Sequence, residues 1–310
     1  MSGSAVLKGA RSELAAKHSL FPNGLEDLQD PVQRLYCIGD ISLLSKQSLA
    51  IVGARKASPY GLRCAERFAK RAAQAGLIVV SGGAIGCDQA AHRGALEGAG
   101  QTIVVLGCGA DVIYPLRARA LFEEVLTCGG LIISEAPWGS PVSRWGFTRR
   151  NRIIAALGWA TLIVEAGLPS GTFSTADATL AQGKDVLVVP GCIDSAGSRG
   201  SNRLLLQGAT PIVDLESFDD VLDIIYGFTL GCSHAVQLSL ELFDEDDSEE
   251  RVDELLLRAC TAQPMRPEEL ASSGIVGTTD LLQIIRMLSA LELDRKITRM
   301  RDGRYTATPS

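Results

Sequence analysis

Residues 49–81 read LAIVGARKASPYGLRCAERFAKRAAQAGLIVVS. The stretch begins and ends with a short apolar run rich in β-branched residues, and the segment between them, residues 61–76, is competent to form a helix. Apolar runs of this length are typical of strands that are buried on both faces of a parallel sheet. The stretch therefore predicts a strand, a helix and a second strand parallel to the first.

The same alternation continues toward the C-terminus at a nearly regular spacing. Strand and helix in alternation indicate an α/β fold, with an open, doubly wound, mainly parallel sheet that helices cover on both faces. A closed eight-unit barrel is the alternative, but only about seven units are visible. The further apolar runs are TIVVLG (102–107), LIIS (131–134), ATLIVE (160–165), DVLVVP (185–190) and ATPIV (209–213).

The rest of the chain does not follow this repeat. Residues 1–45 predict a lead-in segment, irregular or partly helical, that packs on the sheet domain of residues 46–228. Residues 229–250 are polar and acidic and predict a linker. Residues 251–310 predict three helices and a hairpin with a turn at Asp302-Gly303, an arrangement typical of a small winged-helix domain. A DNA-binding and a protein-docking role for this domain both stay open.

The composition is that of a folded globular protein. Of the 310 residues, 46% are hydrophobic and 21% charged, which excludes disorder along the whole chain. No apolar run approaches the roughly 20 residues that cross a bilayer. The N-terminal residues MSGSAVLKGARSEL also lack the apolar core of a signal peptide. We therefore expect a cytoplasmic protein without a membrane partner.

The net charge of −6 is concentrated in one segment. Residues 241–254, ELFDEDDSEERVDE, carry nine acids and one arginine. Removing these eight net negative charges from the total leaves +2 for the rest of the chain. A basic surface elsewhere is thus compatible with the sequence, and the acidic run is typical of a solvated linker.

The eight cysteines and three histidines form no ligand pattern. No CxxC pair occurs, and no histidine lies at ligand spacing from a cysteine pair, so we expect reduced, buried thiols, no metal and no cofactor. His92 is predicted to be a helix residue beneath the sheet rather than a catalytic base. A Walker A motif, a GxSxG elbow and a proper GxGxxG motif are also missing from the sequence.

Four loops at the predicted carboxyl ends of strands are polar and rich in glycine, and ligands bind at this edge of an open parallel sheet. Glycines allow close approach of a ligand, and exposed N–H groups at helix starts attract anions. The loops together predict a phosphate-binding surface, although each glycine alone is equally compatible with a tight turn. The selected loop residues are Gly53, Ser58, Gly82, Gly83, Gly86, Ser170, Gly171 and Thr172.

Residues 144–152, RWGFTRRNR, combine four arginines with two aromatic residues. Arginine pairs with phosphate through two hydrogen bonds, and an aromatic ring stacks on an unpaired base. The segment therefore favours single-stranded nucleic acid over a free nucleotide. The alternative is a helix start whose arginines meet surface carboxylates. The candidate arginines are Arg149, Arg150 and Arg152, with Arg117 and Arg119 as a second, smaller group.

Seven motifs carry a resemblance to a known family. They are IVGARKASPYG (51–61), SGGAIGCDQAAH (81–92), GCGADVIYP (107–115), FTRRNRIIAALG (147–158), SGTFSTA (170–176), VVPG (188–191) and GSNRLLLQGA (200–209). In this order, over about residues 21–213, they resemble the DNA-processing protein A family (DprA, also called Smf).

The resemblance implies an extended Rossmann-like domain that binds single-stranded DNA, protects incoming DNA during natural transformation and helps to load the RecA recombinase. It also implies a homodimer without catalytic residues, and many members carry a C-terminal winged-helix domain. On the matched motifs, Arg55 becomes the leading candidate for a contact with a DNA phosphate. The resemblance also implies that the loops Gly82–Gly86 and Ser170–Thr172 line the same groove and that the three arginines of the basic segment border it.

An enzyme is the main alternative, namely a Rossmann-like nucleotide hydrolase of the lysine-decarboxylase-like group. Such an enzyme needs a carboxylate within the glycine-rich loop. Residues 170–176 have none, and Glu165 precedes them. Asp88 and Glu135 are the other candidates, although a helix cap also accounts for Asp88. A third hypothesis is a winged-helix transcription regulator with a ligand-sensing domain.

Overall fold

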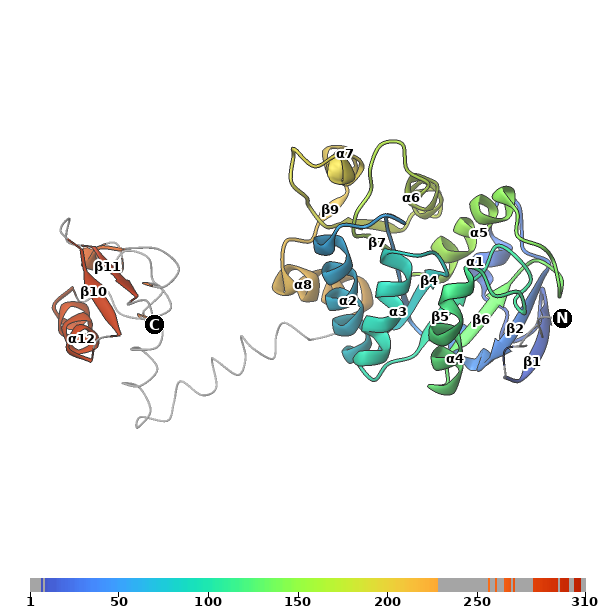
Figure 1. Cartoon of the computed structure of the whole chain (residues 1–310), viewed down its shortest axis with the longest axis horizontal. Helices are drawn as coiled ribbons and strands as arrows, with labels where there is room; N and C mark the ends of the chain where they lie inside the picture. Colours follow the sequence, from blue (N-terminus) through green and yellow to red (C-terminus); the bar gives the residue numbers. More distant parts are fainter. Residues whose placement is uncertain are drawn as a thin grey trace. The chain divides into compact units, whose positions relative to one another are not determined.

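Figure 1 shows the protein as a computed structural model of the whole chain. The chain divides into two compact units, Met1–Ser233 and His234–Ser310. In the first unit the structure describes residues 7 and 9–227. In the second it describes residues 256, 260, 265–268, 270, 281–294, 296–300 and 304–307.

The first unit is built on one nine-stranded sheet with the order β1-β2-β6-β5-β4-β3-β7-β8-β9. The strands from β3 to β9 are parallel, whereas β2 is antiparallel to both of its neighbours, β1 and β6. The strands are β1 (Arg11–Ala15), β2 (Arg34–Gly39), β3 (Ser48–Val52), β4 (Ile78–Gly82), β5 (Thr102–Val105), β6 (Leu131–Ser134), β7 (Ala160–Ile163), β8 (Asp185–Val188) and β9 (Thr210–Pro211).

Helices connect the parallel strands and cover both faces of the sheet (Figure 1). The α-helices are α1 (Asn23–Glu26), α2 (Pro59–Gln74), α3 (Cys87–Glu97), α4 (Arg119–Thr127), α5 (Arg144–Leu157), α6 (Thr172–Leu180), α7 (Arg199–Leu206) and α8 (Leu215–Tyr226). Three short 3-10 helices are η1 (Ile41–Ser45), η2 (Leu116–Ala118) and η3 (Ala196–Ser198).

The predicted open parallel sheet is confirmed, because a strand lies in each of the seven apolar runs. From β3 the chain proceeds through β4 and β5 to β6, and α5 then returns it to β7 on the other side of β3. The loops after β3 and β7 therefore diverge at the carboxyl edge of the sheet. In open parallel sheets this point of reversal is where ligands bind.

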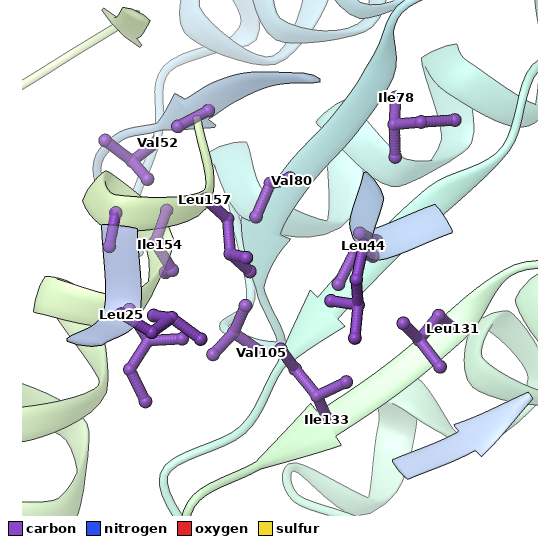
Figure 2. Packing of buried hydrophobic residues seen from close by; sticks show 14 of the residues in the cluster. Leu25, Leu44, Val52, Ile78, Val80, Val105, Leu131, Ile133, Ile154 and Leu157 are labelled. Carbon is purple, nitrogen blue, oxygen red and sulfur yellow. The ribbon is translucent and has the colours of Figure 1, made fainter. Parts of the chain in front are cut away.

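Alternate side chains of each central strand enter two layers of core. In β3, Ala50 and Val52 belong to the layer that includes residues of α5, and Figure 2 shows this layer. Leu49 and Ile51 belong to the opposite layer, which includes residues of α2 and α3. Because all five residues of β3 are buried, the strand reads as a continuous apolar run rather than an alternating one.

The lead-in segment contributes two strands to the sheet, so the predicted irregular or partly helical structure is wrong for these residues. In β2, Leu35 and Cys37 are fully buried in the core beside the sheet. Arg34 is exposed and forms an ion pair of 2.7 Å with Glu13 of β1. Both strands are short, and β6, the partner of β2, lies far along the chain. Neither strand therefore has a strong local signal.

The described residues include neither a membrane-spanning helix nor a paired cysteine. No helix among them is both long and apolar enough to cross a bilayer. All of the described cysteines are free thiols. Four are buried as predicted, but Cys128 and Cys192 are exposed and Cys64 is half-buried. Cys128 ends α4 and Cys192 lies in the loop after β8, and both places face solvent.

In the second unit the structure describes α12 (Leu281–Leu293) and the hairpin strands β10 (Ile297–Arg299) and β11 (Tyr305–Ala307). Met265 forms a further bridge to Tyr305. The predicted turn at Asp302-Gly303 and the predicted linker of residues 229–250 lie outside the described residues. The winged-helix domain of residues 251–310 therefore stays a prediction.

Lys184 closes the end of α5, the helix that carries the basic segment. Its Nζ donates to the carbonyl oxygens of Ala155, Ala156 and Gly158, at 3.1, 2.7 and 2.8 Å. Carbonyls at a helix C-terminus lack partners within the helix, and the helix dipole favours a cation there. We expect Lys184→Met to lower the free energy of unfolding by about 2–3 kcal/mol, measured by urea unfolding followed by circular dichroism.

Lys46→Met is the matched control for this variant. Lys46 is exposed, and its Nζ bonds the side chain of Gln101 at 3.1 Å. A surface change of this kind costs less than about 0.5 kcal/mol. Equal losses in the two variants would contradict the capping role of Lys184.

Candidate nucleic-acid interface

Three neighbouring cavities lie along the carboxyl edge of the sheet. The polar cavity, about 550 Å³, is lined by the loops after β3 and β7. The aromatic cavity, about 290 Å³, is lined by Tyr114 and Phe147 among others. The tryptophan cavity, about 270 Å³, is lined by Trp145 and by the loop after β6. Arg150 lines all three cavities. The aromatic cavity shares further lining residues with each of the other two, whereas those two share only Arg150, so the three form a row with the aromatic cavity in the middle.

Arg55 lies between the polar and the aromatic cavity and lines both. Its guanidinium carbon is 5.1 Å from the ring centre of Phe147, and that ring packs against Tyr114 at 5.4 Å. Lys56, the next residue, is also exposed and lines both cavities. Among the described residues neither Arg55 nor Lys56 takes part in an ion pair. Two uncompensated positive charges thus face the row.

The loop that carries Arg55 is held by Ser58. The Ser58 Oγ accepts from the backbone N–H of Gly61 at 3.1 Å and so caps α2. The same hydroxyl donates to the Glu165 carboxylate at 3.0 Å, and the Ser58 backbone N–H donates to it at 2.9 Å. The hydroxyl hydrogen of Ser58 is therefore already used within the fold. Ser58 positions the loop.

Arg150 is buried beneath the cavities, with 5% of its surface exposed. Its Nη2 lies 3.3 Å from a carboxylate oxygen of Asp88, and its Nη1 donates to the carbonyl of Val105 at 3.1 Å. Burial raises the pKa of Asp88, and the positive charge of Arg150 offsets only part of that effect. A Cβ atom at Gly82 would collide with the Arg150 guanidinium. Arg150 therefore forms a floor of the site rather than its rim.

Arg149 and Arg152 form ion pairs with carboxylates, which is the alternative interpretation of residues 144–152 given by the sequence. Arg149 lies 3.1 Å from Asp30 and 2.9 Å from Glu135. Arg152 lies 2.7 Å from Glu135 and 3.3 Å from Asp30. The two positive and two negative charges compensate one another. The Asp30 side chain is 62% exposed and that of Glu135 only 16%, so Asp30 is the more accessible of the two partners.

Most glycines of the first two loops are explained by packing. Gly86 has a φ of +99°, and a Cβ atom there would collide with the carbonyl of Ala54. A Cβ at Gly53 would lie 2.6 Å from the sulfur of Cys87, and one at Gly83 would also meet protein atoms. These glycines allow the loops to pack against each other and their neighbours.

The glycine-rich loop after β7 faces the polar cavity through Ser170, Gly171 and Thr172. A Cβ at Gly171 would have open space around it. The Ser170 Oγ accepts from the backbone N–H of Thr172 at 3.2 Å and donates to the Thr172 hydroxyl at 3.0 Å. Asn151 of α5 donates to the carbonyl of Gly171 at 3.3 Å. The loop is therefore tied to the helix that carries the arginines.

Arg117 and Arg119 lie apart from the row, on η2 and at the start of α4. Neither lines any of the three cavities. Arg117 is exposed, and Arg119 lies 3.8 Å from Glu123. Their predicted contact with DNA would need a strand that extends beyond the cavities, past Tyr114.

The carboxylates considered for catalysis all have partners in the fold. Asp88 pairs with Arg150, Glu135 with two arginines and Glu165 with Ser58. Asp88 does not cap its helix, because the N-cap of α3 is Gly86. Within the part of the chain that the structure describes, no group of three histidine, cysteine or acidic side chains is placed to hold a metal.

The family model for DNA recombination-mediator protein A matches residues 13–225. The chain belongs to this family. Protein Smf of Escherichia coli is 38% identical over 203 residues, which cover 66% of this chain and 54% of that protein. A putative DNA processing protein DprA of Mycobacterium tuberculosis is 34% identical over 276 residues, which cover 87% and 67%. The chain thus spans about half the length of its Escherichia coli relative.

Two solved structures of family members are similar to this one. DNA processing protein A from Streptococcus pneumoniae is 32% identical with a TM-score of 0.63, covering 67% of this chain and 72% of that one. The Helicobacter pylori protein, described for its single-stranded DNA binding mode, is also 32% identical with a TM-score of 0.63, covering 70% and 97%. These similarities confirm the predicted Rossmann-like fold.

Three residues that line these cavities were missing from the candidates chosen by sequence. Lys56 adjoins Arg55 and lines the same cavities, so its position in the loop was a usable signal. Tyr114 and Phe147 pack together across two separate motifs. Their pairing depends on the fold and has no signature in either motif alone.

His92 is buried in the sheet domain, as predicted, and supports the second loop. Its Nε2 lies 2.9 Å from the carbonyl of Gly82 and its Nδ1 lies 2.7 Å from the Thr102 hydroxyl. A carbonyl only accepts, so Nε2 carries the hydrogen of the neutral ring. Burial lowers the pKa of His92 to about 4.

The lowered pKa of His92 predicts an acid-dependent loss of stability. The unfolded chain takes up a proton below about pH 6.5, which the folded protein excludes down to about pH 4. The free energy of unfolding should therefore fall on acidification, by up to about 3 kcal/mol from this group. Urea unfolding at about pH 7 and about pH 4.5 should show a smaller fall in His92→Gln than in the wild type.

His18→Gln, which changes an exposed histidine, is the control and should keep the wild-type fall. A nuclear magnetic resonance titration of the wild type provides a second measurement. A His92 ring signal that titrates near pH 6.5 would disprove the assignment, whether or not the variant folds.

Proposed function

We propose that this chain is a single-stranded DNA-binding protein that protects incoming DNA during natural transformation and helps to load the RecA recombinase. The observation that carries the proposal is the position of Arg55, an uncompensated cation between a polar and an aromatic cavity. A single strand presents phosphates and unpaired bases in alternation, and this row offers a subsite for each. Membership of the family supports the same function.

The charge of the polar cavity favours a phosphate. Its lining includes Arg55, Lys56 and Arg150 against one carboxylate, Asp88, which leaves a net charge of +2. Exposed guanidinium groups bind phosphate through paired, charge-assisted hydrogen bonds. The loop Ser170–Thr172, at the start of α6, lines the same cavity with polar groups. Phosphate binding in this cavity would place the next base beside Phe147.

We infer that the protein binds DNA without chemical turnover, cofactor or metal. A nucleotide hydrolase needs a carboxylate free to act on the ribose, and the three candidates are engaged with Arg150, with Arg149 and Arg152, and with Ser58. The proposed homodimer, the RecA partner and the cytoplasmic location rest on the family resemblance and the sequence.

Arg55→Ala should weaken binding of a poly-thymidine strand by about 1–3 kcal/mol, because a charge-assisted phosphate contact is lost. The slope of log affinity against log salt concentration should also decrease in magnitude by about 0.7, the value of one phosphate contact on a single strand. Fluorescence anisotropy of a labelled strand at several salt concentrations measures both effects.

Arg93→Ala is the control, because Arg93 lies on α3, is exposed, and pairs with Glu66 rather than lining the row. It should bind like the wild type. Unchanged affinity in Arg55→Ala would remove Arg55 from the site. If the wild-type chain does not bind single-stranded DNA, the proposed function is overturned. A preference for one duplex sequence would favour the transcription-regulator hypothesis.

Asp30→Asn should strengthen binding of the same strand about two- to five-fold. Asp30 is the exposed carboxylate that neutralises Arg149 and Arg152, so its removal frees positive charge for phosphates. Asp27→Asn removes a charge from the same loop at an exposed position and should have less effect. Equal affinities for the wild type and Asp30→Asn would exclude Arg149 and Arg152 from the DNA contact.

A further inference from the structure

We propose that the tryptophan cavity is a second base-binding subsite, in which an unpaired nucleobase stacks on Trp145. The inference rests on the proposed binding of single-stranded DNA and extends the bound strand beyond the aromatic cavity, toward the end of β6. The two cavities share Leu106, Gly107 and Arg150 in their linings. Consecutive bases of one strand can therefore occupy neighbouring subsites.

Trp145 is a large aromatic side chain that the fold leaves exposed. It lies in the first turn of α5, keeps 66% of its surface accessible and lines the cavity. The Arg149 guanidinium carbon lies 4.7 Å from the ring centre, and Arg149 is itself fixed by Asp30 and Glu135. The ring is thus oriented by a cation while most of the residue stays open to another planar group.

Two hydrogen bonds anchor the loop after β6, which forms another wall of this cavity. The backbone N–H of Gly139 donates to Asp111 at 2.8 Å. The indole N–H of Trp138 donates to Glu13 of β1 at 2.9 Å. Pro137 and Pro141 also line the cavity, and proline restricts the backbone. Because this wall is already ordered before binding, the protein loses less conformational entropy when a ligand binds.

The charges around the cavity favour a base over a phosphate. The lining contains Arg149, Arg150 and the Glu135 carboxylate. Glu135 and Asp30 pair with Arg149, and Asp88 pairs with Arg150, which leaves little positive charge for an anion. The polar cavity, by contrast, carries a net positive charge. A neutral nucleobase with two π-faces suits a compensated cavity with an open indole ring.

Tryptophan fluorescence tests the proposal directly, since the chain has three tryptophans. Titration of the full chain with a poly-thymidine strand should quench the emission, because a stacked base quenches an indole. Trp145→Phe should lose most of this quenching while it keeps near wild-type affinity in anisotropy. Trp145→Ala should bind the strand about 5- to 100-fold more weakly, the effect of losing one base–aromatic stack.

Two controls separate a stacking role from a structural one. Trp159→Phe should keep the quenching, because Trp159 lies at the opposite edge of the sheet, just before β7, and stacks on Tyr226 at 5.6 Å. An abasic strand of equal length keeps the phosphates but lacks bases, so Trp145→Ala and the wild type should bind it equally.

The outcomes distinguish this inference from the proposed function. Quenching that survives in Trp145→Phe would overturn the subsite, as would a loss of affinity in Trp145→Ala that is the same for the normal and the abasic strand. If the wild type binds neither strand, the proposed function itself fails. Binding that depends on Arg55 but not on Trp145 would leave that function intact and remove only this subsite.

Discussion

The buried ion pair between Arg150 and Asp88 is the interaction on which the candidate site depends. Both residues are almost completely removed from water, so loss of either partner leaves an uncompensated charge in the interior. The pair joins α5 to the first turn of α3, and the bond to Val105 joins both to the end of β5. The pair lies beneath all three cavities. The Arg150 guanidinium fits there only because residue 82 is glycine, since a Cβ atom at Gly82 would collide with it.

This constraint divides the arginines of the basic segment into separate roles. Arg150 supports the floor, while Arg149 and Arg152 are compensated by Asp30 and Glu135. The uncompensated charge lies instead on the loop after β3, in Arg55 and Lys56. That loop begins at the point where the strand order reverses, and Ser58 holds it to Glu165, just after β7. Electrostatic attraction for a polyanion is therefore focused on a short, firmly held segment.

The sequence predicted the parallel sheet well because buried parallel strands are continuous apolar runs, such as residues 49–53, that need no partner to be recognised. It failed for β1 and β2, whose signal depends on pairing with a distant strand. The same difference separates the parts of the site. The loops of the site could be predicted because each one follows an apolar run and so lies at the carboxyl edge of the sheet. The compensation of Arg149 could not be predicted in this way, because it depends on Asp30, which is far away in the sequence.

The glycines of the first two loops serve packing rather than ligand binding. In a dinucleotide-binding fold, the glycines of the first loop let the backbone enclose a pyrophosphate. Here Gly53 and Gly86 are used to pack two loops against each other, so the backbone has no such cradle to offer. Ligand binding must then rely on side chains along the edge. Cavities that share lining residues in a row allow a chain to continue from one to the next, and a polymer needs this continuity while a free nucleotide does not.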